Sequence, residues 1–241
     1  LITAAGVPDT FADNPHLEFV EHNIIEPCCP GGRFDHIIHA AGIASPFYYR
    51  AHPLETLDVA IAGTRNLLDL AREGHSHFVY FSSSEIYGDP DPAHVPTPES
   101  YCGNVSCVGP RACYDEGKRA AETLFFDYYR ENDVDIRVAR IFNTYGPNMH
   151  PFDGRVVSNF IRQALAGEDI TIFGEGLQTR SFCYVSDLVD GLVRWMNMDD
   201  ITGPVNLGNP QERTILDLAE HVIDLTGSGS ALVRKPLPPD D

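Results

Sequence analysis

Two kinds of hydrophobic pattern alternate along the chain, and together they predict alternating strands and helices. Short apolar runs at residues 36–39, 78–81 and 136–142 predict strands, and the second run is typical of a strand buried on both faces of a parallel sheet. Between them, apolar residues recur at helical spacing over residues 54–71 and 114–130. The pattern predicts an α/β fold with a Rossmann-like, doubly wound parallel sheet, which binds ligands beyond the carboxyl ends of its strands.

The pattern changes after about residue 146. Further elements are expected at residues 156–166 (helix), 170–173 (strand), 186–196 (helix) and 214–226 (helix). The last two helices each start near a hydroxyl residue, Ser186 or Thr214, which is predicted to be the N-cap. We therefore divide the chain into a Rossmann-like domain at residues 1–146 and a smaller lobe at 147–241 that supplies the substrate side of a cleft.

Composition limits the partners. The formal charge of −18 argues against nucleic acid and anionic membranes, which need a basic face, and no apolar run is long enough to span a bilayer. The six cysteines show no C-x-x-C spacing, so we expect free thiols, no metal and a reducing, cytoplasmic compartment. The Golgi lumen is the alternative if a membrane anchor precedes the chain in a eukaryote.

One tyrosine and lysine pair indicates chemistry. Lys118, one of only two lysines, follows Tyr114 by four residues on a predicted helix, so the two side chains share a face. A phenol with a pKa near 10 is a poor base, but an adjacent ammonium and a cationic cofactor ring favour the phenolate. Such a phenolate can take the proton of a substrate hydroxyl while hydride leaves the same carbon. A solvent-exposed helix pair is the alternative interpretation of the spacing.

A second candidate follows the strand at residues 78–81. The stretch FSSSEIYGD places Ser83 and Glu85 at the carboxyl end of a buried strand, where a doubly wound sheet binds its ligand. Ser83 is positioned to hydrogen-bond the same hydroxyl as Tyr114, and Glu85 to act on the neighbouring carbon. A polar strand end that turns into a loop is the alternative.

Longer motifs resemble a known family. The stretches SSSEIYGDP, GPRACYDEGKRAAETL, RVARIFNTYGPNMH, DGRVVSNFI and GLQTRSFCYVSDLVDGL resemble the extended short-chain dehydrogenase/reductase family, and within it the UDP-glucuronate decarboxylases, or UDP-xylose synthases. The resemblance implies NAD as cofactor and a catalytic set of Ser83, Tyr114 and Lys118, with Glu85 handling a proton or water at C5. It implies oxidation at C4, loss of carbon dioxide, and release of UDP-xylose or a UDP-4-keto-pentose.

The resemblance also implies binding residues. On the substrate side these are Tyr49 near the sugar carboxylate, Ser84, which replaces the acid of the 4,6-dehydratases, and Asn143 and Arg180 for the phosphates and sugar. On the cofactor side, Tyr114 and Lys118 are joined by Asn23, Ile24, Ala40 and Ala41. A homodimer that pairs the helix of Tyr114 and Lys118 is expected as well.

Some positions depart from the family pattern. Cys102 and residues 106–108 differ in a loop that we expect next to the substrate, which leaves open another NDP-sugar 4,6-dehydratase or 4-epimerase, or a non-catalytic nucleotide-binding protein. At the start, residues 1–6 fit a strand and turn, but the first βαβ unit and its phosphate-binding loop are incomplete. Relatives continue past residue 241 with an arginine-rich segment, so the lobe is expected to be incomplete too.

Overall fold

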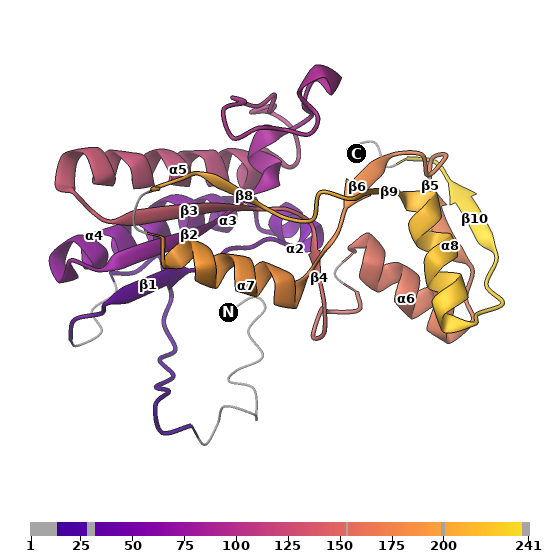
Figure 1. Cartoon of the computed structure of the whole chain (residues 1–241), viewed down its shortest axis with the longest axis horizontal. Helices are drawn as coiled ribbons and strands as arrows, with labels where there is room; N and C mark the ends of the chain where they lie inside the picture. Colours follow the sequence, from indigo (N-terminus) through magenta and orange to yellow (C-terminus); the bar gives the residue numbers. More distant parts are fainter. Residues whose placement is uncertain (1–13, 28–31, 153, 199–200, 238–241) are drawn as a thin grey trace.

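The computed structural model describes residues 14–27, 32–152, 154–198 and 201–237, and its core is a parallel sheet of four strands (Figure 1). The predicted strand and turn at residues 1–6 lie outside the described residues. The strand order is β1-β2-β3-β8, and the strands are β1 (His36–His39), β2 (His77–Ser83), β3 (Ile136–Ile141) and β8 (Val205–Leu207). The predicted parallel sheet is confirmed, and β8 adds a fourth strand that the hydrophobic pattern did not predict.

Helices cover both faces of this sheet. On one face, α4 (Thr64–Gly74) and α5 (Ala112–Asn132) bury a cluster that includes Leu68, Phe78 and Phe125. On the other face, α7 (Val185–Met196) packs Leu188, Leu192 and Trp195 against β3 and β8. Alternate residues of β2 and β3 point to opposite faces, and because both faces are covered, ten of the thirteen positions are buried. The buried positions include four polar ones, Ser82, Ser83, Arg137 and Arg140.

The predicted helix at residues 54–71 consists of three joined segments. It starts as α3 (Pro53–Asp58), passes through a π-helical turn at Val59–Gly63 and continues as α4 to Gly74. The helix α2 (Pro46–Ala51) and two short 3₁₀ helices (Ser84–Tyr87, Pro92–His94) complete this half. In the part of the chain that the structure describes, we find no helix with the length and apolar character needed to traverse a lipid bilayer.

The second half forms a lobe beside the sheet (Figure 1). In it, α6 (Val156–Ala166) and α8 (Ile215–Thr226) pack on two parallel strands, β5 (Ile170–Phe173) and β10 (Leu232–Lys235). Two further strand pairs link lobe and sheet: β4 (Thr144–Tyr145) with β7 (Cys183–Tyr184), and β6 (Thr179–Ser181) with β9 (Glu212–Thr214). Because α7 and β8 return to the main sheet, the chain crosses between the two regions more than once.

The predicted N-caps have different outcomes. Thr214 caps α8, since its hydroxyl accepts a hydrogen bond from the Asp217 N–H and the Asp217 carboxylate accepts one from the Thr214 N–H. The prediction for Ser186 is wrong, because α7 starts at Val185 and its N-cap is Tyr184, which makes no side-chain capping bond. Asp187 in the first turn of α7 still places a negative charge at the positive end of the helix dipole.

Candidate active site

A cavity of about 450 Å³ lies beyond the carboxyl ends of β1, β2 and β3, where the lobe meets the sheet. Its position is the one at which open α/β sheets bind ligands. Residues from both halves of the chain line it, from Ala40 after β1 to Arg180 in β6. Nine of the predicted site residues are among them: Ala40, Tyr49, Ser83, Ser84, Glu85, Tyr114, Lys118, Asn143 and Arg180.

The end of β2 holds Ser83 in place. Its hydroxyl oxygen accepts a hydrogen bond from the Glu85 N–H at 3.2 Å and so caps the 3₁₀ helix that follows. Two residues earlier, the carbonyl oxygen of Phe81 accepts a hydrogen bond from Lys118 Nζ at 2.7 Å. The strand end and the helix α5 are therefore tied together, and Ser83 and Lys118 both line the cavity.

Tyr114 lies partly buried in the wall of the site. Burial raises the pKa of its phenol, and a hydrogen bond with the Ser83 side chain opposes this rise. The residues of the protein alone therefore do not lower the Tyr114 pKa as predicted. The phenolate loses more stabilisation by its removal from water than it gains from the nearby hydrogen bond. A cationic cofactor ring would have to supply the missing stabilisation.

The lysine side chain is held beside two aromatic rings. Lys118 Nζ lies 5.8 Å from the centre of the Tyr114 ring and 4.9 Å from that of Tyr80. Burial lowers the pKa of Lys118 to about 8, although the negative charge of Glu122, one turn along α5, favours the ammonium. Lys118 is thus still mostly protonated at pH 7, but it loses its proton at a lower pH than an ordinary lysine.

Tyr49 stacks on Tyr114, the predicted catalytic tyrosine. The ring centres of Tyr49 and Tyr114 are 5.2 Å apart and the rings are inclined by 14°. Burial raises the pKa of Tyr49 to about 12, and its hydroxyl oxygen is buried with no hydrogen-bond partner in the described ranges. A buried hydroxyl without a partner is costly, so it is available to a ligand atom.

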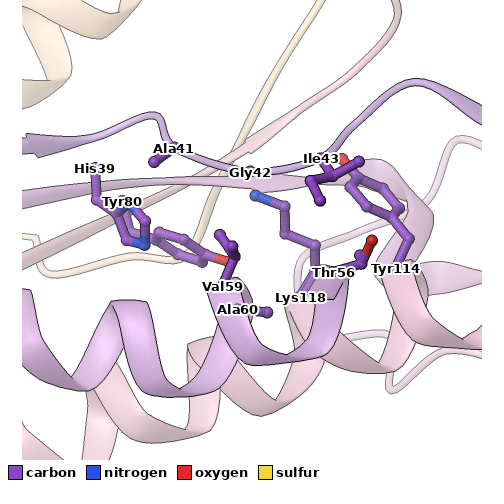
Figure 2. A pocket seen from close by; sticks show the side chains of 10 residues that line it. All are labelled: His39, Ala41, Gly42, Ile43, Thr56, Val59, Ala60, Tyr80, Tyr114 and Lys118. Carbon is purple, nitrogen blue, oxygen red and sulfur yellow. The ribbon is translucent and has the colours of Figure 1, made fainter. Parts of the chain in front are cut away.

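Beside Lys118, a second, water-sized cavity lies between β1, the π-helical turn and α5 (Figure 2). The predicted residue Ala41 lines this space, together with His39 and Tyr80, which sequence analysis did not single out. Burial and the charge of Lys118 lower the pKa of His39 to about 3, so its imidazole is neutral, and Nε2 lies 3.0 Å from Thr64 Oγ1. A neutral imidazole here leaves Lys118 as the cation of this region.

Small residues after β1 leave room for a cofactor. A Cβ atom added to Gly42 would lie 3.7 Å from Lys118 Nζ, so the absence of a side chain keeps the space above the lysine open. Ala40 lines the same side of the larger cavity. This cradle of small residues, with an ammonium at its base, fits the ribose and ring of a nicotinamide cofactor.

Asn23 and Ile24 lie elsewhere. The Ile24 carbonyl oxygen accepts a hydrogen bond from the Asn66 side chain at 3.0 Å, and the Ile24 side chain packs against Gly63 in the π-helical turn. Neither Asn23 nor Ile24 lines the larger cavity or the one beside Lys118. The structure does not bring them to the catalytic groups, and their contact with the cofactor stays a prediction.

Two arginines in the cavity were not predicted. Arg111, the N-cap residue of α5, makes an ion pair with Glu85, and Arg155, the N-cap residue of α6, also lines the cavity. The sequence carried a signal for Arg111, because it precedes Tyr114 by three residues at the start of the same helix. Four of the 17 Lys and Arg residues of this acidic protein thus line the cavity.

The loop with Cys102 does not line the cavity. Cys102 is exposed, and its carbonyl oxygen accepts a hydrogen bond from Arg119 at 2.8 Å. Residues 106–108 are also absent from the cavity wall, and Val108 is 90% exposed. The expectation that this loop adjoins the substrate is therefore wrong for these positions, and Arg111 is the part of the segment that reaches the site.

Comparison with known proteins gives the family. The model of the NAD dependent epimerase/dehydratase family matches residues 13–208, and the chain belongs to this family. It is 51% identical over 228 residues to UDP-glucuronic acid decarboxylase 5 of Arabidopsis thaliana, with 95% of this chain and 65% of the relative covered. It is 50% identical to UDP-glucuronic acid decarboxylase 1 of Xenopus tropicalis, with 90% and 50% covered. The chain therefore spans between half and two thirds of the length of these relatives.

Solved structures agree on the fold. UDP-glucose 4-epimerase of Thermotoga maritima with UDP-glucose superposes with a TM-score of 0.79 at 27% identity, over 86% of this chain and 66% of that one. This likeness extends the family assignment to the three-dimensional arrangement of sheet and lobe.

Proposed function

We propose that this chain carries the active site of an NAD-dependent UDP-glucuronate decarboxylase that forms UDP-xylose or a UDP-4-keto-pentose. The observation that carries the proposal is the single cavity in which Ser83, Glu85, Tyr114 and Lys118 meet residues of the lobe. The identity of about half of all residues with two UDP-glucuronic acid decarboxylases supports the same reaction.

The first step uses Tyr114 as a general base. It removes the proton of the C4 hydroxyl, and Ser83, whose side chain hydrogen-bonds Tyr114, orients that hydroxyl. When bound, NAD would accept the hydride from C4; the hydride would return to C4 in a cycle that ends at UDP-xylose and would stay on the cofactor in a cycle that releases the 4-keto pentose. Lys118, anchored on the Phe81 carbonyl, keeps a positive charge next to the phenolate.

The second step breaks the bond between C5 and the carboxylate. The 4-keto sugar is a β-keto acid, so the electrons of that bond move into the ketone and form an enolate while carbon dioxide leaves. Ser83 and Tyr114 donate hydrogen bonds to the enolate oxygen. C5 then takes up one proton, and Glu85 handles this proton or orients the water that delivers it.

Residues of both halves supply the nucleotide and sugar side. Arg180 and Asn143 bind the phosphates and sugar, and the unpartnered hydroxyl of Tyr49 reaches the sugar carboxylate. Ser84 lines the same cavity without adding a negative charge, whereas a carboxylate at this position would repel the substrate. Asn23, Ile24, Ala40 and Ala41 complete the cofactor side of the proposal.

Assembly and compartment are part of the proposal. We expect a homodimer that pairs α5 of two copies, which a mass measurement by light scattering tests: a monomeric mass would contradict it. A reducing, cytoplasmic compartment is supported by Cys102, Cys107, Cys113 and Cys183, which are free thiols; Cys28 and Cys29 lie outside the described residues.

A related activity is the second candidate. The structural likeness to a UDP-glucose 4-epimerase favours reversible oxidation at C4 without loss of carbon dioxide. The serine at position 84 speaks against a 4,6-dehydratase, which uses an acid pair to protonate its leaving hydroxyl. A non-catalytic nucleotide-binding role is the third.

Product analysis separates these candidates. The protein is incubated with NAD and, in parallel, with UDP-glucuronate, UDP-glucose or dTDP-glucose, and the sugars are identified by NMR. We expect a UDP-pentose from UDP-glucuronate alone, formed about 10²- to 10⁴-fold more slowly after the substitution Tyr114→Phe. Turnover of either glucose nucleotide without turnover of UDP-glucuronate would replace the proposed activity by the second candidate.

A further inference from the structure

We propose that Arg111 recognises the substrate carboxylate by exchanging Glu85 for it, and that this exchange makes the site selective for a sugar acid. The inference rests on the proposed function and names a specificity-determining residue within it. Its starting point is the ion pair between Arg111 and Glu85, which stands in the wall of the cavity. Both side chains are about one-third exposed, at 31% for Arg111 and 37% for Glu85.

The position of this pair matches the position of the substrate carboxylate. Glu85 follows Ser83 by two residues, and Arg111 precedes Tyr114 by three at the start of α5. Ser83 and Tyr114 act at C4 of the sugar, and the carboxylate is attached to C5, the next ring carbon. Glu85 and Arg111 are therefore each close in the chain to a residue that acts at C4, the carbon next to the one that bears the carboxylate.

The charged residues of the cavity indicate that Arg111 faces the substrate carboxylate. The charged residues that line it are Glu85, Arg111, Lys118, Arg155 and Arg180. These four cations and one anion match a ligand with about three negative charges, two on the diphosphate and one on the sugar carboxylate. Without Arg111, the substrate carboxylate would face the Glu85 carboxylate with no cation between them, and like charges at close range repel.

Geometry favours Arg111 over the other cations. Lys118 is held by the Phe81 carbonyl, while Arg180 lies in β6 and Arg155 at the start of α6, both on the lobe side. A guanidinium binds a carboxylate through two parallel hydrogen bonds, and it can leave one carboxylate for another with little change in geometry. After carbon dioxide is lost, the product has no carboxylate, so Arg111 returns to Glu85 and product binding weakens.

Calorimetry with three nucleotides tests the exchange. Affinities for UDP, UDP-glucose and UDP-glucuronate are measured with NAD present and with Tyr114→Phe in every variant, so that no turnover occurs. For Arg111→Met we expect UDP-glucuronate to bind on the order of 10- to 100-fold more weakly, with UDP and UDP-glucose changed less than about threefold. The matched control Arg180→Met weakens all three ligands alike.

Glu85 variants separate exchange from simple charge neutralisation. The exchange model predicts that Glu85→Gln tightens UDP-glucuronate by about 3- to 10-fold relative to UDP-glucose, because the competing carboxylate is gone. It also predicts that Arg111→Met weakens UDP-glucuronate by the same factor when Glu85→Gln is present. If the double variant binds like Glu85→Gln alone, Arg111 only neutralises Glu85, and the proposal is overturned.

Other outcomes are equally decisive. An equal loss for all three nucleotides in Arg111→Met, or a selective loss in Arg155→Met instead, overturns the exchange but leaves the proposed decarboxylation standing. Absence of any preference for UDP-glucuronate over UDP-glucose before Arg111 is changed overturns the exchange, while the product analysis decides the proposed decarboxylation. The failure of the exchange and the failure of the proposed function are thus distinguishable.

Discussion

Two arginine–glutamate pairs stand near each other in this protein, and they differ in their surroundings. Glu122 and Arg140 are about one-tenth exposed, and Arg140 binds Glu122 through Nε at 3.0 Å and Nη2 at 2.7 Å. Glu85 and Arg111 are about one-third exposed and face the cavity. The Arg140–Glu122 pair, which is buried and fully hydrogen-bonded, has a structural role. The Arg111–Glu85 pair, which is accessible to solvent, remains available to a ligand.

The buried pair is part of a network under the site. The Ser82 hydroxyl donates to Glu122 at 2.5 Å, and Arg140 Nη1 donates to the Tyr87 hydroxyl at 2.8 Å. Tyr87 in turn donates to Asn206 in β8 at 2.7 Å. The network joins β2, β3, β8 and α5, so it fixes the strand end that carries Ser83 relative to the helix that carries Tyr114 and Lys118.

Removal of the buried carboxylate is expected to have the largest effect. Glu122→Ala leaves Arg140 as a buried cation without its partner, which typically costs about 3–5 kcal/mol of folding free energy. Urea unfolding at pH 7 measures this loss. A loss below about 1 kcal/mol would show that the buried pair is no more structural than the exposed one.

Lys118 is expected to destabilise the fold. Its pKa falls from 10.5 to about 8 on folding, which corresponds to a cost of about 3 kcal/mol for the charged form at pH 7. The lost hydrogen bond to the Phe81 carbonyl offsets about 1 kcal/mol. Lys118→Met should therefore stabilise the cofactor-free protein by about 2 kcal/mol at pH 7 while it abolishes activity.

The pH dependence of the free energy of unfolding tests whether the charge of Lys118 causes this destabilisation. Between pH 8 and 10.5 the unfolded chain keeps the Lys118 proton that the folded protein has lost, so wild-type stability should rise in this window. The advantage of Lys118→Met should shrink by pH 10.5. An advantage that is independent of pH would mean that packing, not charge, is the cause.

Asp115, which follows Tyr114, is also expected to destabilise the fold at pH 7, but by less than Lys118. Burial, strengthened by the charge of Glu85, raises the pKa of its carboxyl to about 6, although Arg111 opposes the shift. The stability that the protonated carboxyl contributes is present below pH 3.8 and is lost as pH rises through 6. Asp115→Asn should stabilise the protein by about 1 kcal/mol at pH 7 after solvent screening. A difference that stays constant from pH 4 to 7 would contradict this.

The exposed pair should contribute least to stability. Glu85→Ala is expected to change the free energy of unfolding by less than about 1 kcal/mol, since exposed ion pairs contribute little. Urea unfolding in parallel with Glu122→Ala gives the comparison directly. Equal losses in the two variants would remove the distinction between the pairs.

The sequence predicted the parts of the structure that depend on local pattern. The helix Val156–Ala166 and the strands His36–His39 and Ile170–Phe173 have the predicted bounds, because apolar spacing and flanking turns define them. The strands β8 and β10 were missed, because each is defined by its pairing with a strand far away in the chain, β8 with β3 and β10 with β5. The N-cap error at Ser186 arose because a hydroxyl residue near a helix start need not be the first residue outside it.

The site shows the same division. Tyr114 and Lys118 were found because they are one helical turn apart, and Ser83 and Glu85 because they follow a buried strand. The partners in the two ion pairs are 18 and 26 residues apart, and no local period connects them. Such contacts are created by the fold, so the pairing of Arg140 with Glu122 and of Arg111 with Glu85 emerges only from the structure, although helical spacing could have indicated Arg111 itself.

Release of carbon dioxide tests the central claim most directly. The protein is incubated with NAD and UDP-glucuronate that carries carbon-14 in its carboxyl group, and trapped radioactivity is counted over time. The account predicts labelled carbon dioxide from the wild type and a rate lower by about 10²- to 10⁴-fold for Tyr114→Phe. No labelled gas from a protein that binds both NAD and UDP-glucuronate would contradict it.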